Sequence, residues 1–399
     1  MREQLNLFGI EPISVTDSID LTISSLKEYG SRHSHWAAAW SWGKDSTAMV
    51  TLVTQLITTG QIPTPESFTV FAADTRMELI PLWLSSQVIK SQLESRGVNV
   101  EIVTAPIDDR FLVYILGRGV PPPSNTFRWC TGQIKVEPME KALASLISEK
   151  QEKVLMLTGV RMGESAVRDQ RINLSCSKDG SECGQGWYQS GLQNDLCATL
   201  APILHWRVCN VWDWLKVFAP MPKYGGWDTT LLADAYGGDE AEEINARTGC
   251  IGCPLVNKDT AIDTLIGMPK WKYLTPLKSL KPLYREMRSP EHRLRKPGGE
   301  RRKDGTLSKN QQRMGPLTIE ARNYFIEKII EIQKEVNHSA VKVGMPVIDI
   351  LNTEEIDRIR ELIALETYPN KWDGTEPLAS ESHDVQYSDG SVMKRLFYD

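Results

Sequence analysis

One short turn constrains the folding of this chain more than any other stretch. Residues 41–46 read Ser-Trp-Gly-Lys-Asp-Ser; an apolar run precedes them and a helix-like run follows. A strand that passes through a glycine turn into a helix presents backbone N–H groups and the positive end of the helix dipole to a phosphate. The Lys44 ammonium group and the serine hydroxyl groups add further donors. The candidate phosphate ligands are Ser41, Gly43, Lys44, Asp45 and Ser46.

This turn is not a Walker-type loop, because the chain lacks the G-x-x-x-x-G-K-[ST] pattern. It resembles the S-G-G-K-D-S "PP-loop" of the ATP pyrophosphatases, which cleave ATP between its α and β phosphates. The resemblance implies ATP as ligand, with Lys44 and Asp45 as catalytic residues on an exposed turn. Trp42 replaces the usual first glycine, and tryptophan is strained at the positive φ that glycine adopts freely. Either the turn keeps a negative φ there, or the indole faces the ligand.

Length and composition set the class of protein. The 399 residues suffice for one large domain or two ordinary ones. No run approaches about 18 uninterrupted apolar residues, and the opening Met-Arg-Glu-Gln begins no signal peptide, so we expect a cytoplasmic protein without membrane contact. Seven cysteines, an odd number, argue against a disulfide framework and favour metal or thiol chemistry.

The charge is unevenly distributed. The net charge is −5, yet residues 281–313 hold eleven Lys and Arg against four Asp and Glu, a local charge of +7. A basic segment on an acidic protein indicates contact with a polyanion such as DNA. The alternative is a solvated linker, which the Lys-Pro-Gly-Gly run at 296–299 supports.

Short apolar runs alternate with helical patterns after residue 35. The predicted strands are 36–41, 67–73, 98–104 and 153–158, and the helices between them include 47–57 and 78–96. This alternation predicts an α/β fold with a doubly wound, mostly parallel sheet. Ligands of such sheets lie at the carboxyl ends of the strands. Ser41, Asp74, Pro106 and Gly159 fall there.

The chain is expected to divide into four parts. These are a lead-in at 1–34, a nucleotide-binding domain with a cysteine cluster at 35–255, a basic segment at 256–316, and C-terminal helices with a tail at 317–399. The lead-in carries an amphipathic helix at 19–29. The last part is predicted to hold a helix at 317–336, another from Glu354 behind the cap Asn352, and a flexible polar tail at 380–399.

The turn Asp74-Thr75-Arg76 follows the second predicted strand. An acidic residue at this place suits a ribose hydroxyl or a Mg²⁺ ion carried by triphosphate. The alternative role is to cap the next helix, since Asp74 or Thr75 precedes the helical run from Glu78. Both roles are compatible.

Several further motifs occur in a fixed order. They are Arg128-Trp-Cys-Thr with Lys135 and Pro138, Gly159-Val-Arg161-Met-Gly-Glu-Ser with Arg168, and Pro202-Ile-Leu-His-Trp with Val211-Trp. With the two turns above, this series resembles the phosphoadenosine phosphosulfate (PAPS) reductase-like superfamily over about 36–255. The resemblance implies an adenine nucleotide α-hydrolase-like fold. It makes Gly159 and Arg161 ATP ligands, and Arg128, Lys135 and Arg168 ligands of phosphate or substrate. A surface ion pair is the alternative for any one arginine.

Two cysteines form the second strong signal. Cys250 and Cys253 are separated by two residues and followed by proline. Such a pair suits zinc, redox chemistry or half of an iron–sulfur site, and the proline favours the last. The resemblance adds Cys130, and the glycines near Cys183 favour it as fourth ligand of a [4Fe–4S] cluster. The alternatives are Cys176 in place of Cys183, or the pair of Cys176 and Cys183 in place of Cys130.

Three functions compete. A sulfonucleotide reductase of this superfamily carries a catalytic cysteine near its C-terminus, and no cysteine follows Cys253 here, so this hypothesis falls. A redox or regulatory protein with a degenerate nucleotide site is the non-enzymatic alternative, and Trp42 is its best support.

The third function is an ATP pyrophosphatase that activates a nucleic-acid oxygen for replacement by sulfur. It needs an ATP site, a thiolate cluster and a basic segment, and the sequence offers all three. DNA phosphorothioation (the Dnd and Ssp systems) and tRNA thiolation share this chemistry. The C-terminal helical extension and the motif order resemble the phosphorothioation pyrophosphatase more closely. The implied cofactors are ATP, Mg²⁺ and [4Fe–4S]; the implied partners are DNA, a cysteine desulfurase as sulfur donor and other modification-system subunits.

Overall fold

The structure is a computed structural model, and the chain in it divides into two compact units. The first unit comprises Met1–Ala73, Ile80–Val103 and Pro138–Thr248, and the second comprises Asp74–Leu79, Thr104–Glu137 and Gly249–Asp399. The described residues are 14–164, 169–170, 172, 187–192, 197–238, 248–296, 305–306, 313–369, 371–381, 383–386 and 392–395.

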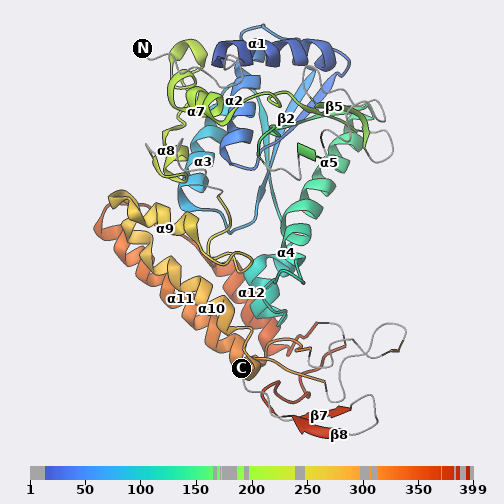
Figure 1. The fold of residues 1–399 in the computed structure, drawn as a ribbon, viewed down its shortest axis with the longest axis vertical. Coiled ribbons are helices and arrows are strands. Elements are labelled where there is room, and N and C mark those ends of the chain that lie inside the picture. Colours follow the sequence, from blue (N-terminus) through green and yellow to red (C-terminus); the bar gives the residue numbers. More distant parts are fainter. Residues whose placement is uncertain are drawn as a thin grey trace, which may run out of the picture. The chain divides into compact units, whose positions relative to one another are not determined.

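The first unit is built on a six-stranded sheet with the strand order β3-β2-β1-β4-β6-β5 (Figure 1). Its strands are β1 His35–Ala39, β2 Ser67–Asp74, β3 Asn99–Thr104, β4 Val154–Thr158, β5 Trp187–Leu192 and β6 Cys197–Ala201. Strand β1 is parallel to β2 and β4, and β4 is parallel to β6. Strands β5 and β6 pair in the antiparallel direction. The predicted α/β class with a mostly parallel sheet is therefore confirmed.

Helices cover the sheet of the first unit. They are α1 Val15–Ser25, η1 Leu26–Gly30, α2 Lys44–Thr58, α3 Ile80–Glu94, α5 Glu137–Lys150, α7 Val208–Asp213, η5 Trp214–Phe218, η6 Pro222–Tyr224 and α8 Thr230–Asp234. Helix α5 packs on the sheet face that carries Ala37, Phe71 and Met156. Figure 1 shows α2 and α3 on the other side of the strands. Every residue of α2 from position 46 to 56 is buried, so this helix is enclosed all round.

The second unit is mainly helical. Its elements are η2 Ile107–Asp109, η3 Val113–Gly117, α4 Trp129–Thr131, η4 Gly132–Val136, α9 Thr260–Gly267, η8 Pro269–Ser279, α10 Leu280–Glu286, η9 Pro290–His292, α11 Ile319–Lys342 and α12 Thr353–Ala364. Two strands, β7 His383–Gln386 and β8 Val392–Arg395, form an antiparallel hairpin. The sequence predicts a flexible tail where this hairpin lies. It also predicts a helix that ends at Val336, whereas α11 continues to Lys342 and buries Ala340 one turn further on.

Capping and buried charge hold the C-terminal helices. The Thr318 hydroxyl accepts the Ala321 N–H at the start of α11, and Asn352 caps α12 as predicted, in a capping box with Glu355. Each cap contributes about 1 kcal/mol. The buried Glu355 carboxylate lies 3.4 Å from both Arg76 Nε and Arg110 Nη1. Two guanidinium groups therefore neutralise the one buried carboxylate and fix α12 within its unit.

No helix in the described part of the chain has the length and apolar character needed to cross a membrane.

Candidate functional site

The phosphate turn connects β1 to α2 in the first unit. The Ser46 hydroxyl organises it, lying 3.0 Å from Ser41 Oγ, donating to the Gly43 carbonyl at 3.1 Å and accepting the Ser41 N–H at 3.1 Å. Gly43 is the N-cap residue of α2. The N–H groups in the first turn of a helix lack intrahelical acceptors. Those of Asp45 and Ser46 find no other acceptor among the described residues, so they remain available to an anion.

Gly159 lies against the start of α2. A Cβ atom at this position would be 2.7 Å from both the Ser46 nitrogen and the Ser46 Cα. Such contacts are too short for any side chain, so only glycine lets the end of β4 approach the helix. The sequence predicts Gly159 as part of the nucleotide site, and the structure brings it to the phosphate turn.

Asp45 is held by an ion pair. Its carboxylate lies 2.5 Å from Arg161 Nε and 3.5 Å from Lys44 Nζ. Arg161 also donates to the Trp206 carbonyl at 3.3 Å, and its side chain is only 5% exposed. The Lys44 and Asp45 side chains are each 14% exposed, so the expectation that both lie on an exposed turn is wrong. Arg161 was predicted as an ATP ligand, and here its guanidinium neutralises Asp45.

Tyr236, which the sequence analysis did not single out, completes the turn. Its hydroxyl accepts the Lys44 N–H at 3.0 Å and lies 3.2 Å from Thr248 Oγ1. The Lys44 ammonium lies 4.8 Å from the centre of its ring. Ala-Tyr-Gly-Gly is no recognised motif, and Tyr236 is separated from Lys44 by 192 positions. No local sequence signal could have identified this contact.

Trp42 adopts a positive φ of 61°. Its side chain is 2% exposed and packs edge-on against Trp40, with ring centres 6.5 Å apart. The indole Nε1 has no hydrogen-bond partner in the described part of the chain. The first of the two sequence-based alternatives, a negative φ, is therefore wrong. Burial of the indole offsets the cost of the left-handed backbone.

Asp74 and its neighbours form a tight turn in the second unit. The Asp74 carboxylate accepts the Arg76 N–H at 2.8 Å, and Arg76 has a φ of 61°. Glu78 accepts from the Thr75 hydroxyl at 2.5 Å and from the Met77 N–H at 3.1 Å. Helix α3 begins only at Ile80. Asp74 therefore caps its own turn and not the helix, and its role toward ribose or Mg²⁺ stays a prediction.

Three of the predicted cluster cysteines belong to the second unit. Cys130 lies in α4, and the Cys250–Cys253 loop is fixed by two backbone bonds: Ile251 N–H to the Met77 carbonyl at 2.7 Å, and Gly252 N–H to Asp259 Oδ2 at 3.1 Å. Gly252 has a φ of 64°, and a Cβ there would lie 2.9 Å from Leu280 Cβ. Glycine is required for this loop.

The thiols influence one another electrostatically. Burial raises the pKa of Cys130, and the neighbouring Cys253 raises it further. Desolvation and like charge raise the pKa of Cys250 to about 12, although its side chain keeps an exposed face. The like charges are those of Glu78, Cys253 and Cys130. The described residues contain no set of three His, Cys, Asp or Glu side chains placed to hold one metal ion.

Comparison with known protein families agrees with this geometry. Residues 35–218 match the family model of the phosphoadenosine phosphosulfate reductase domain. This stretch, a little under half of the chain, is similar to that domain. Its boundaries contain the whole phosphate turn, Gly159 and Arg161. The Cys250–Cys253 loop and the C-terminal helices lie beyond it. Comparison with curated proteins gave no significant match.

Solved structures resemble parts of the chain. The PAPS reductase of Candida auris, in a phosphate complex, has a TM-score of 0.32 at 11% identity, over 52% of this chain and 88% of that one. The Candida glabrata FMN adenylyltransferase with FMN and AMPCPP scores 0.31 at 15% identity, over 53% and 60%. The U34-tRNA thiolase of Methanococcus maripaludis with its [4Fe–4S] cluster scores 0.32 at 15% identity, over 68% and 79%. Similarity at this level defines neither substrate nor reaction.

The other predicted phosphate or substrate ligands are Arg128, Lys135 and Arg168, and the structure describes only the first two. Arg128 is exposed and donates to Asn125 Oδ1 at 3.0 Å, and Lys135 is also exposed. Both belong to the second unit. Arg168 lies outside the described residues, as do Cys183 and Cys176.

The basic segment is partly buried where it is described. Arg293 and Arg295 are 6% and 4% exposed. Arg293 donates to the Gly315 and Met314 carbonyls at 2.5 and 2.9 Å. Burial, with the nearby Arg288, Arg295 and Arg313, lowers the pKa of Arg293 to about 10. Part of the predicted +7 charge therefore has a structural role. Hydrogen bonds, including those of the Arg293 guanidinium, connect residues 293–295 to residues 314–316.

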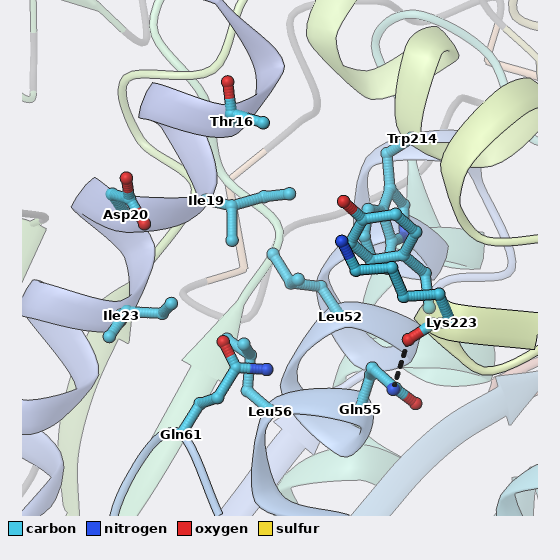
Figure 2. A pocket seen from close by; sticks show the side chains of 11 residues that line it. Thr16, Ile19, Asp20, Ile23, Leu52, Gln55, Leu56, Gln61, Trp214 and Lys223 are labelled. Atoms are coloured by element: carbon cyan, nitrogen blue, oxygen red, sulfur yellow. Dashed lines mark hydrogen bonds between the residues drawn. The ribbon is translucent and has the colours of Figure 1, made fainter. Parts of the chain in front are cut away.

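A hollow of about 280 Å³ lies elsewhere in the first unit (Figure 2). It is lined by Ile19 and Ile23 of α1, Leu52 and Leu56 of α2, and Trp214, among others. Its α2 residues start eight positions after Lys44, or about 12 Å along the helix. This hollow is therefore distinct from the phosphate turn.

Proposed function

We propose that this protein binds ATP at residues 41–46 and cleaves it between the α and β phosphates, to activate a nucleic-acid oxygen for replacement by sulfur. The observation that carries the proposal is the turn itself, where the free amides of Asp45 and Ser46 follow Lys44, whose ammonium is a further donor. These donors suit the phosphates of a nucleotide that ends as pyrophosphate.

The reaction divides into two steps. An oxygen of the nucleic acid attacks the α phosphorus of ATP, the α–β bond breaks, and pyrophosphate leaves with the bonding electrons. A hydrosulfide ion or a persulfide then attacks the adenylated centre, and AMP departs with the original oxygen. If a persulfide attacks, a thiol reductant must later supply two electrons to break the S–S bond.

This chain's own residues supply binding and orientation in the first step. Lys44 and the amides of the turn neutralise charge that develops on the leaving pyrophosphate. The ion pair of Asp45 with the buried Arg161 holds the first turn of α2 in place. Asp74 is proposed as a ligand for Mg²⁺ or the ribose, through its carboxylate.

The thiols of Cys130, Cys250 and Cys253 fit an iron–sulfur cluster chemically. Burial and neighbouring negative charge raise the pKa of Cys130 and of Cys250, and Lys135 opposes the rise at Cys250 only in part; a metal centre would supply further positive charge. The thiols do not converge on one ion position. A four-iron cluster is proposed over zinc because a proline follows Cys253. Such a cluster would bind and activate sulfide, with Cys183 or Cys176 as fourth ligand.

DNA is the proposed nucleic acid, and the basic segment is the proposed contact. The support is the local charge of +7 over 281–313 on a chain whose net charge is −5. A cysteine desulfurase and other subunits of a DNA phosphorothioation system are the proposed partners.

The test is the fate of ATP labelled at the α phosphate, supplied with Mg²⁺, a sulfide source and either duplex DNA or tRNA. We expect labelled AMP with one pyrophosphate per turnover, and ³⁵S in the DNA. Labelled ADP with inorganic phosphate would overturn the proposed cleavage. Incorporation of ³⁵S into tRNA alone would assign the protein to tRNA thiolation.

A further inference from the structure

Tyr236 is positioned for more than packing. Its ring meets Trp212 edge-on, with the ring centres 5.2 Å apart, and the residue is 3% exposed. Its hydroxyl oxygen nevertheless reaches the first amide of α2, the Lys44 N–H, at 3.0 Å. A Cβ placed on Gly43 would be 3.2 Å from the same oxygen. The phenol is therefore at the phosphate turn, next to the free amides of Asp45 and Ser46.

The hydrogen-bonding capacity of a phenol limits what Tyr236 can do there. A tyrosine hydroxyl has one proton to donate and also accepts. Because the oxygen already accepts from Lys44, the proton is directed elsewhere. In this structure Thr248 Oγ1 is within reach, at 3.2 Å.

The hydroxyl also keeps its proton at neutral pH. Burial, the largest cause, raises the pKa of Tyr236, and the negative charges of Asp45 and Glu164 act in the same direction. A protonated phenol that accepts from a polarised amide is a stronger donor than an isolated one.

We propose that the Tyr236 hydroxyl accepts the Lys44 amide hydrogen and donates its own hydrogen bond to a phosphate oxygen of the bound nucleotide. The inference rests on the proposed function, because it takes the turn as the triphosphate site. When the nucleotide binds, the phosphate oxygen held by the Asp45 and Ser46 amides accepts the Tyr236 hydroxyl proton in place of Thr248 Oγ1. Tyr236, which is 192 positions from Lys44 in the sequence, would thereby add a hydrogen-bond donor to those of the turn.

The chemistry of this interaction is that of a neutral donor to an anion. A hydrogen bond to a charged group is stronger than one between neutral groups, and removing one typically weakens binding by about tenfold or more. Since the hydrogen bond is made to the bound nucleotide and to the transition state alike, its removal should act on binding more than on turnover.

The test compares Tyr236→Phe with the parent full-length protein. The variant keeps the ring, its contact with Trp212 and its position under the Lys44 ammonium, and removes only the hydroxyl. Binding of α,β-methylene ATP is measured by calorimetry, and pyrophosphate release from ATP gives KM and kcat. We expect Kd and KM to rise about tenfold while kcat changes less than about twofold.

Two further variants separate a phosphate contact from a structural role. Tyr224→Phe removes a hydroxyl from another tyrosine of the same unit, whose ring meets Trp214 at 5.9 Å, and should bind nucleotide as the parent does. Thr248→Val removes the competing acceptor and should bind nucleotide at least as tightly as the parent. If Thr248→Val weakens binding as much as Tyr236→Phe, the Tyr236–Thr248 bond is structural and the proposal is overturned.

Failure of the inference is distinguishable from failure of the proposed function. A parent that binds the analogue and releases pyrophosphate, beside a Tyr236→Phe variant with the same Kd, overturns only the role of Tyr236. A parent that neither binds the analogue nor releases pyrophosphate overturns both. Melting temperatures of all variants show whether each remains folded.

Discussion

The two candidate sites differ in how their polar groups are satisfied. At the phosphate turn, Ser46 ties the backbone and Arg161 neutralises Asp45, so the turn is formed before any ligand binds. At the cysteine site, like charges and burial raise the pKa values of Cys130 and Cys250, and Lys135 opposes the rise at Cys250. The difference indicates that the first site is preorganised, whereas the second would be stabilised by the proposed cluster.

The largest expected effect is on the cysteine site. Cys250→Ser should abolish the visible absorbance expected of the proposed iron–sulfur cluster and lower the free energy of unfolding of the protein by several kcal/mol, because metal binding contributes to folding. Iron analysis and anaerobic spectra of the purified protein provide the measurement. Cys209→Ser, at an exposed cysteine of the first unit, is the matched control and should retain full iron. Full iron in Cys250→Ser would exclude this thiol as a ligand.

Asp45→Ala should destabilise the first unit. It leaves the buried Arg161 guanidinium without its carboxylate, and breaking such a pair costs about 3–5 kcal/mol. Urea unfolding gives the change. Asp109→Ala breaks a more exposed pair, with Arg118 at 3.5 Å, and should cost less than about 1 kcal/mol. Equal losses of stability in the two variants would contradict the buried ion pair as the element that preorganises the turn.

Lys44→Ala should affect the reaction more than the fold. Removing a cation from the phosphate site should lower kcat for pyrophosphate release by about 10²–10³. Lys223→Ala, an exposed lysine of the same unit, is the control and should leave the rate unchanged. Parental pyrophosphate release by Lys44→Ala would mean that the turn does not serve ATP cleavage.

Trp42 allows the backbone cost of the turn to be measured. Trp42→Ala should lower the free energy of unfolding by about 3–5 kcal/mol through loss of the buried indole. Trp42→Gly should be about 1 kcal/mol more stable than Trp42→Ala, because glycine adopts the positive φ without strain. Equal stability of the two variants would show that the backbone of the turn is not strained.

The smallest expected effect concerns the basic segment. Replacing Arg301, Arg302 and Lys303 by alanine should weaken DNA binding and reduce its log–log salt slope by about 0.9 for each DNA phosphate that these side chains no longer neutralise. ATP cleavage should stay unchanged. Lys328→Ala on α11 is the control, since that lysine pairs with Glu331 at 2.8 Å. An unchanged salt slope in the triple variant would identify the segment as a linker.

The sequence predicted the sheet well because its signals are local. Buried runs such as 67–73 lie between turns, and the helix that follows Lys44 begins behind a glycine cap. The β5–β6 hairpin was missed because its strands lie in a stretch whose composition is typical of a loop. The hairpin within 380–399 was missed because polar strands lack the alternation that marks a half-buried sheet.

The candidate sites were predictable where residues are contiguous and not where they are distant. Residues 41–46 and the Cys250–Cys253 pair are visible in the sequence. The contacts of Arg161 with Asp45 and of Tyr236 with Lys44 join segments 116 and 192 positions apart. The exposure of Asp45 was misjudged for the same reason, since the side chain that covers it comes from the loop after β4.

The buried tryptophan in the turn also has a consequence for protein engineering. A glycine at position 42 leaves the space of the indole empty, and any other side chain must adopt the same positive φ without filling that space. In a library that randomises position 42 alone, we therefore expect every variant to be less stable than the parent protein. Variants with a conventional glycine turn become accessible when smaller side chains around the vacated indole site are enlarged in the same round, so position 42 and its surroundings must be redesigned together.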